Sequence, residues 1–309
     1  MAAGVFKKFF AKSRLRLAVC LWLFAAAASV TATPTAGGES ALGVVDDGGR
    51  QVQLEAPAQR IVTLAPHGAE LVFAAGAGAK LVGATSFSNY PPEAEQVPRI
   101  GDAARLDRER LLALEPDLVI AWPSGNRPQD LAWLEKRGIT LYRSDPAKLQ
   151  DIGENIREIG RLAGSGDIAA AATARFVDRL AGLRRRYSRP MPLRVFYQIW
   201  PNPLFTVGNG HIISQVLTLC GGRTLFPDLA TLTPTVSREA VILADPQAII
   251  AAIPEQDGDD PFTQWRRWRS IEAVRTERFI RVPADLIHRP TPRILDGAEL
   301  ICRGLHANP

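Results

Sequence analysis

The sequence predicts an α/β protein: two similar α/β lobes with mostly parallel sheets, bridged by one long α-helix. Short apolar segments alternate with helical segments at the spacing of β–α–β units, both before and after the middle of the chain. The middle, residues 149–189, has helical periodicity and no strand pattern. A third observation is a sequence pattern that recurs 130 residues after its first occurrence. Two such lobes predict a ligand cleft between them.

Composition indicates an ordinary globular protein. The chain has 309 residues, of which 46% are hydrophobic and 22% charged, so it has room for two domains of usual size. Its net charge of +5 first suggests a nucleic-acid partner. Five of the 37 basic residues precede residue 17, however, and residues 1–32 contain no acid, so the remainder has 32 basic and 32 acidic residues. That balance predicts no nucleic-acid surface.

Residues 1–32 have the parts of a secretory signal peptide. A basic start is followed by the apolar run Leu17 to Ala28 and by small residues before a cleavage point after Ala32. A membrane anchor is the alternative, but about a dozen apolar residues fall short of the ~20 that span a bilayer. A lipoprotein at Cys20 is disfavoured because Val19 is bulkier than the small residue usual there. We expect export and cleavage.

Export changes how the cysteines are interpreted. After cleavage only Cys220 and Cys302 remain, an even pair in an oxidising compartment, which favours a disulfide. The alternative is two separately buried thiols. Neither cysteine has an adjacent base that would make it a nucleophile.

Residues 33–59 predict a disordered lead-in and then a hairpin, with its turn at residues 46–49. Residues 60–148 predict the N-terminal α/β lobe. Its expected strands are 60–64, 81–84, 118–121 and 139–142, and its expected helices 69–75, 106–114 and 131–137.

Residues 149–189 predict the helical bridge. Apolar residues recur at helical spacing up to the break at residues 164–166, after which Asp167 is expected to cap an alanine-rich helix. Arginines 184–186 fit either an anion site or the solvated C-terminal end of this helix, where positive charge suits the helix dipole.

Residues 190–305 predict the C-terminal α/β lobe. We expect a strand at 194–199, a break at 200–203, a helix ending near residues 220–222 and another helix starting at 236–239. The segment 108–120 is matched by 238–250, so that Glu109 and Glu239 open equivalent helices on the two lobes.

Several stretches resemble a known family. They are Ser88-Asn89-Tyr90-Pro91-Pro92, residues 116–122 with Gly125-Asn126, Asn202-Pro203 with Phe205-Thr206, Val236-Ser237-Arg238-Glu239, and Pro292-Arg293-Ile294. From about Arg60 to Leu305 the chain resembles the periplasmic class III solute-binding proteins that serve importers of metal chelates, and among them those of cobalamin (vitamin B12) importers. Cys220 and Cys302 fall where that family has its disulfide.

The resemblance implies a role for Glu109 and Glu239. They stand at the two acidic positions that dock on arginines of the transmembrane permease of an ABC importer. One exposed carboxylate on each lobe suits two-point contact with a symmetric partner. The alternative is that each acid only complements its helix dipole.

The resemblance also implies which residues line the ligand cleft. A corrin ring has a broad apolar face and amides at its rim, so aromatic walls with a few polar groups suit it. Two tryptophans of the family correspond here to Ala103 and Thr233. Either Trp200 and Trp122 supply the aromatic surface that is lost there, or they are ordinary partly buried tryptophans. Phe87 stands where the family has a tyrosine. The expected ligand-binding residues are His67, Phe87, Tyr90, Trp200, Phe205, Asp285 and Arg289.

The histidines give no metal-site pattern. His67 lies in the first expected strand-to-helix loop and His288 lies next to Arg289, and each either coordinates the metal of a bound chelate or only lines the pocket. His211 and His306 have no metal-ligand spacing with them, so we expect no zinc site. The motifs Gly-x-Ser-x-Gly, phosphate loop and His-Glu-x-x-His do not occur.

The sequence therefore predicts a monomeric, non-enzymatic, periplasmic binding protein without a cofactor. It is expected to capture cobalamin or a related corrinoid and to present it to an inner-membrane ABC importer. A ferric siderophore or haem is the alternative ligand, and a secreted hydrolytic or redox enzyme is a more distant alternative.

Overall fold

The computed structural model describes residues 42–102, 105–254 and 260–307. These described residues belong to one compact unit. The predicted signal peptide, the first part of the lead-in and Ala103 lie outside the described residues. In the described part of the chain, no helix combines the length and the apolarity that crossing a membrane requires.

A hairpin precedes the first lobe, as predicted. Strands β1 (Leu42–Val45) and β2 (Gln51–Leu54) pair antiparallel. In the turn between them, the Asp46 carboxylate accepts a hydrogen bond from the backbone N–H of Arg50 at 2.9 Å. The same buried carboxylate forms an ion pair with Arg143 at 3.1 Å, and this contact ties the hairpin to the first sheet.

The first lobe contains a four-stranded parallel sheet of order β4-β3-β5-β6. All four predicted strands are confirmed, within two residues at each end. The strands are β3 (Ile61–Thr63), β4 (Leu81–Ala84), β5 (Leu118–Ala121) and β6 (Leu141–Arg143). Their helices are α1 (Pro66–Ala74), α2 (Arg108–Ala113) and α3 (Pro128–Lys136), with 3₁₀ turns η1 (Gly78–Lys80) and η2 (Pro92–Gln96) that the sequence did not indicate.

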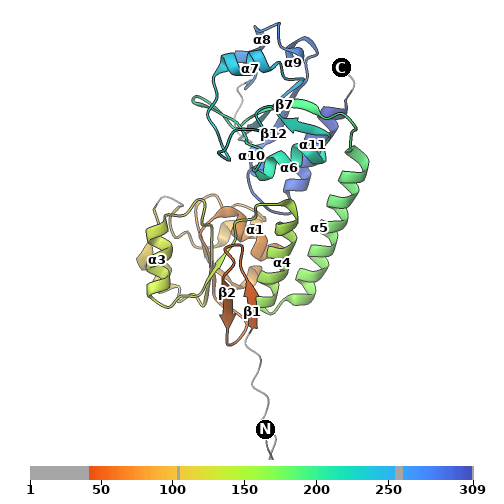
Figure 1. Cartoon of the computed structure of the whole chain (residues 1–309). Coiled ribbons are helices and arrows are strands. Elements are labelled where there is room, and N and C mark those ends of the chain that lie inside the picture. The colour runs from red at the N-terminus through yellow and green to blue at the C-terminus, as the bar shows by residue number, and fades with distance from the viewer. Residues whose placement is uncertain (1–41, 103–104, 255–259, 308–309) are drawn as a thin grey trace, which may run out of the picture. The chain divides into compact units, whose positions relative to one another are not determined.

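Two helices follow the first sheet and lie alongside each other (Figure 1). Helix α4 (Leu149–Ala163) ends at Gly164, whose backbone is left-handed (φ 71°), a conformation that glycine adopts without steric cost. Helix α5 (Gly166–Tyr187) has 22 residues and leads into the second sheet. The expectation that Asp167 caps α5 was wrong: Ser165 occupies the cap position, and Asp167 lies in the first turn, where its charge still suits the dipole.

The second lobe repeats the first sheet in a parallel sheet of order β10-β7-β11-β12. Its strands are β7 (Leu193–Gln198), β10 (Gly222–Thr224), β11 (Ala248–Ile253) and β12 (Phe279–Pro283). At the expected break, β8 (Trp200–Pro201) and β9 (Leu204–Phe205) form a small hairpin. The helices are α6 (Ile212–Leu219), α7 (Arg238–Ala244), α8 (Thr263–Arg266), α9 (Glu272–Arg275), α10 (Ala284–Ile287) and α11 (Ile294–His306).

The internal repeat extends to backbone detail. Strands β5 and β11 hold the third position in their sheets. The helix before each starts at a capping side chain, Asp107 or Ser237, which accepts from the backbone N–H three residues on. Each helix also ends before a left-handed residue, Glu115 (φ 44°) or Asp245 (φ 43°). The segments 108–120 and 238–250 therefore have equivalent settings, as the sequence predicted.

One apolar core continues from the first sheet to the second. Buried side chains of β3, α4 and β7, such as Ile61, Ile159 and Val195, belong to the same cluster of contacts. Each lobe has a further apolar cluster of its own. Because protein interiors are close-packed, this continuous core favours small rather than large movements between the lobes.

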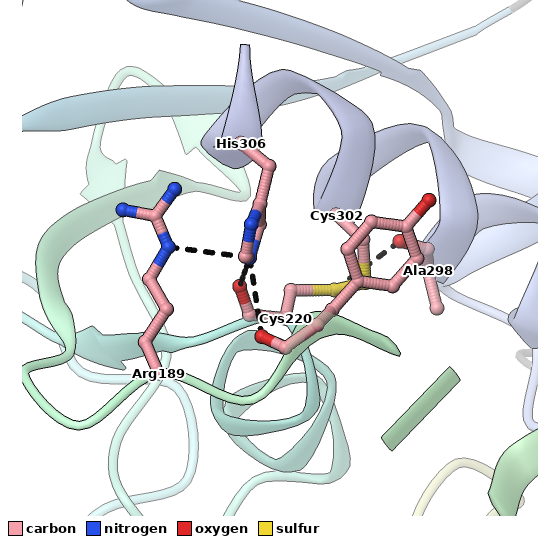
Figure 2. The surroundings of a disulfide bond; sticks show 6 residues. Arg189, Cys220, Ala298, Cys302 and His306 are labelled. Atoms are coloured by element: carbon pink, nitrogen blue, oxygen red, sulfur yellow. Dashed lines mark hydrogen bonds between the residues drawn. A yellow bond between two sulfur atoms is a disulfide. The ribbon is translucent and has the colours of Figure 1, made fainter. Parts of the chain in front are cut away.

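The predicted disulfide Cys220–Cys302 is present (Figure 2). It joins the end of α6 to α11, and both cysteines are fully buried. His306 lies beside it, with Nε2 3.1 Å from the carbonyl oxygens of Tyr187 and Cys220. The bond thus closes a chain segment of 82 residues within the second lobe.

Candidate ligand-binding site

The candidate residues lie on loops that follow parallel strands. His67 comes after β3, and Phe87 and Tyr90 come after β4. In the second lobe, Trp200 follows β7, while the candidates Asp285 and Arg289 follow β12. The carboxyl ends of parallel strands are where open α/β sheets place ligands, so both lobes present these residues at the appropriate edge.

Arg289 joins the two lobes through hydrogen bonds. Its Nη1 donates to Glu70 Oε1 at 3.0 Å and to Asn89 Oδ1 at 2.8 Å, both in the first lobe. Its Nη2 lies 2.7 Å from Asp285 Oδ2 in the second lobe. Only 10% of the Arg289 side chain is exposed, so these charge-assisted contacts hold the guanidinium in one place.

Arg293 makes a second connection between the lobes. It donates to both oxygens of Glu70, from Nε at 2.9 Å and from Nη2 at 2.7 Å. Its guanidinium carbon lies 3.7 Å from the centre of the Tyr90 ring, a cation–π geometry. Burial alone would lower the pKa of Arg293, but the hydrogen bonds and charge of Glu70, together with the charges of Tyr90 and Asp285, give a net upward shift. We call Glu70, Asn89, Tyr90, Asp285, Arg289 and Arg293 the interlobe cluster.

His67 is buried next to this cluster. Its Nε2 lies 3.3 Å from the carbonyl oxygen of Ser144, and its ring meets the Trp122 ring edge-on with centres 5.5 Å apart. Burial lowers the pKa of His67 to about 4, because the imidazolium would lose its hydration there. His67 is therefore neutral at physiological pH.

The aromatic candidates of the second lobe lie on the β8–β9 hairpin. Trp200 and Phe205 are paired residues across it, with Phe205 half-buried and Trp200 56% exposed. Trp200 lines a pocket of about 490 Å³ together with Ile199 and Ile253. Such a surface can receive a flat apolar group.

Phe87 is the most exposed aromatic candidate. It is 76% exposed, and its backbone is left-handed (φ 66°), which is rare for a bulky residue. Strained backbone of this kind occurs preferentially at ligand sites.

Trp122 and Trp200, the two tryptophans considered as replacements for the family's missing aromatic residues, differ in burial and in contacts. Trp122 is half-buried, contacts His67 and donates its indole N–H to Asp145 Oδ1 at 3.2 Å. Trp200 presents more of its ring to solvent. Thr233 is exposed, while Ala103 lies outside the described residues.

The remaining histidines have other partners. His288 Nε2 lies 3.1 Å from the Tyr197 hydroxyl, and His211 accepts through Nδ1 from the backbone N–H of Ile213. Within the described residues, no group of three or more His, Cys, Asp and Glu side chains is placed to hold a metal ion.

Glu109 and Glu239 lie in the first turns of α2 and α7, and both are exposed. Among the described residues neither carboxylate takes part in an ion pair. Arg108 and Arg238, which precede them, are both half-buried. The two glutamates are thus available to a partner.

The structure therefore sorts the candidates into groups. Tyr90, Asp285 and Arg289 meet in the interlobe cluster, and Trp200 meets Phe205 in the hairpin. The sequence analysis gave no role to Glu70, Asn89 or Arg293. One signal was available: Glu70 is an acid in a helix of mostly apolar residues, where a buried charge is expected only with a partner.

A family model described as "Periplasmic binding protein" matches residues 61–286. The chain belongs to the periplasmic binding protein family. Members of this family capture a solute outside the cytoplasm, which implies a periplasmic location. The architecture of two α/β lobes with a ligand cleft between them agrees with the sequence prediction.

Individual relatives carry more specific names. The chain is 38% identical over 247 residues to the vitamin B12-binding protein of Vibrio cholerae, covering 80% of this chain and 88% of that protein. The crystal structure of the periplasmic vitamin B12 binding protein BtuF of Vibrio cholerae matches with a TM-score of 0.74 and 38% identity, over 81% of this chain and 97% of that one. These relatives are binding proteins, not enzymes.

A haem-binding relative shares only the fold. The periplasmic heme-binding protein RhuT from Roseiflexus sp. RS-1 matches with a TM-score of 0.70 and 24% identity, over 81% of this chain and 98% of that one. At that identity the likeness says nothing about the ligand of this chain.

Proposed function

We propose that this protein captures cobalamin, or a related corrinoid, between its two lobes and delivers it to an inner-membrane ABC importer. The observation that carries the proposal is the 38% identity, over most of both chains, to a vitamin B12-binding protein of the same fold. The mature protein would begin after Ala32, act in the periplasm and work as a monomer.

The residues proposed for ligand contact suit a corrinoid. Phe87, Tyr90, Trp200 and Phe205 offer aromatic surface to the apolar faces of the ring. Asp285 and Arg289 offer an acceptor and a donor to the amides at its rim. His67 is buried and neutral, so its part is that of a wall residue behind these groups.

Glu109 and Glu239 are proposed to dock on the permease subunits. Their support is their exposure and their equivalent positions in the two halves of the repeat. Two carboxylates in matched settings fit a partner that presents two matched cationic sites.

Titration calorimetry with purified mature protein tests the ligand. We expect cyanocobalamin to bind with a submicromolar dissociation constant, and haem and a ferric hydroxamate siderophore to bind at least a hundredfold more weakly. Absence of cobalamin binding together with tight binding of haem or the ferric chelate would reject the proposal in favour of another metal chelate.

A further inference from the structure

Glu70 is the point at which the ion pairs between the lobes converge. Both arginines of the second lobe that reach across, Arg289 and Arg293, contact its carboxylate at 2.7–3.0 Å. Among the described residues, every ion pair between the first lobe and the segment after residue 189 ends on Glu70. Its side chain is only 2% exposed.

Burial makes these contacts interdependent. A buried carboxylate is tolerated where it is paired and fully hydrogen-bonded, and here the two guanidinium groups supply both conditions. Without the Glu70 charge, Arg289 would keep Asp285 and Asn89, but Arg293 would lose Glu70 as its ion-pair partner. Two neighbouring guanidinium groups would then face one carboxylate, which favours separation and hydration of the lobes.

The cluster also orients the residues proposed to contact ligand. Glu70 holds Arg289 from one side while Asp285 holds it from the other. Arg293, fixed by the two hydrogen bonds that it donates to Glu70, lies over the Tyr90 ring. Glu70 itself is too deeply buried to present a surface to the ligand.

We propose that Glu70 is a positioning residue that draws the second lobe onto the first through Arg289 and Arg293, and so sets the spacing of the cleft walls before ligand arrives. The part of this inference that concerns ligand rests on the proposed function. The part that concerns lobe spacing stands on the contacts alone.

Lobe spacing is measured directly by pulsed dipolar spectroscopy on the mature, unliganded protein. Spin labels are placed at Lys136→Cys in α3 and Arg223→Cys in β10, two exposed positions on different lobes. The buried Cys220–Cys302 disulfide leaves the engineered thiols as the reactive ones. The variants are Glu70→Gln, which removes the charge at constant size, and Arg293→Gln, which removes the same connection from the other lobe.

Glu299→Gln is the matched control. Glu299 also pairs with two arginines, Arg179 at 3.3 Å and Arg303 at 2.6 Å, but it is a more exposed residue outside the cluster. We expect Glu70→Gln and Arg293→Gln to lengthen the label distance by more than the ~2 Å that separates domain rearrangement from side-chain adjustment, and to broaden it. The control should give the wild-type distance. An unchanged distance in either folded cluster variant would overturn the proposal.

Cobalamin dissociation provides the second measurement, by stopped flow. Glu70→Gln should raise the dissociation rate about tenfold with a smaller change in the association rate, because interface changes act mainly on dissociation. Glu70→Asp, which retains the charge, should restore part of the loss. A wild-type dissociation rate in Glu70→Gln would contradict the ligand part. If the wild-type protein does not bind cobalamin, the proposed function fails, while the label distances still decide the role of Glu70.

Discussion

Arg108 and Arg238, 130 positions apart, each reach from the start of a helix to the helix that follows the next strand. Arg108 donates to Asp130 of α3 from Nε at 3.1 Å and from Nη2 at 2.6 Å. Arg238 donates from Nη2 to Gln264 of α8 at 3.3 Å, and its Nε is buried without a partner. The arginine next to each of Glu109 and Glu239 thus links the helix start to the following helix, with a charged partner in one lobe and a neutral partner in the other.

This asymmetry predicts unequal effects on stability. Arg108→Met should lower the free energy of unfolding by about 1–2 kcal/mol, because it leaves Asp130, whose side chain is 9% exposed, without its cation. Arg238→Met should change it by less than about 1 kcal/mol, since it removes a long hydrogen bond and an unsatisfied donor. Urea unfolding measures both; an equal loss in the two variants would contradict the interpretation.

The docking proposal predicts a separation of ligand binding from delivery. Glu109→Gln and Glu239→Gln should leave cobalamin affinity within twofold, because both glutamates are exposed at helix starts and neither belongs to the interlobe cluster. Each should weaken binding to the importer in lipid nanodiscs about threefold to tenfold at low salt, the double variant more. Glu154→Gln, an exposed glutamate of α4, is the control. Unaltered importer binding by the double variant would exclude the docking role.

The repeat was predictable because its signals are local. The strand at residues 118–121 and the helix start at Ser237 can each be recognised from a few neighbouring residues. The edge strands β10 and β12 and the four-residue helices α8, α9 and α10 were not predicted, since such short elements depend on tertiary contacts.

The interlobe cluster was only partly predictable, for a different reason. Tyr90, Asp285 and Arg289 came from a family resemblance, whereas the partners of Glu70 lie 219 and 223 residues further along the chain. Local sequence marks Glu70 as an unusual acid in an apolar helix, but it does not say which cations reach it. Only the packing of α1 near the start of α11 answers that question.

Removing the Cys220–Cys302 disulfide should lower the free energy of unfolding. For a closed segment of 82 residues, the chain-entropy model gives a loss of about 4.5 kcal/mol for Cys220→Ser with Cys302→Ser. Urea unfolding of the oxidised protein and of the double variant measures it. Because both cysteines are fully buried, reductant alone should not open the bond in the native protein. A loss below about 1 kcal/mol would mean that the unfolded chain is already constrained in another way.

The lowered pKa of the buried His67 predicts that the folded protein loses stability in mild acid. The folded protein keeps His67 neutral down to a pKa of about 4, whereas the unfolded chain protonates it near its ordinary pKa of 6.5. Between these values the unfolded state binds more protons, so the contribution of His67 is complete above pH 6.5 and declines as the pH falls towards 4. The full decline corresponds to about 3 kcal/mol.

The comparison with His67→Asn isolates this effect, because all other groups titrate in both proteins. We expect the free energy of unfolding of the wild type to fall by about 2–3 kcal/mol more than that of the variant between pH 7 and pH 4.5, as measured by urea unfolding. Parallel pH profiles for the two proteins would show that His67 is protonated in the folded state as readily as in the unfolded chain.

The aromatic walls predict losses of affinity without losses of stability. Phe87→Ala and Trp200→Ala remove rings that are 76% and 56% exposed in the unliganded protein, so folding should change by less than about 0.5 kcal/mol. Because a corrin face would cover these rings, each variant should raise the cobalamin dissociation constant about tenfold or more by calorimetry. Met191→Ala, at a residue 83% exposed and outside the proposed site, should bind as the wild type does. Wild-type affinity in both aromatic variants would mean that the ligand rests on other surfaces, with the pocket beside Trp200 left free.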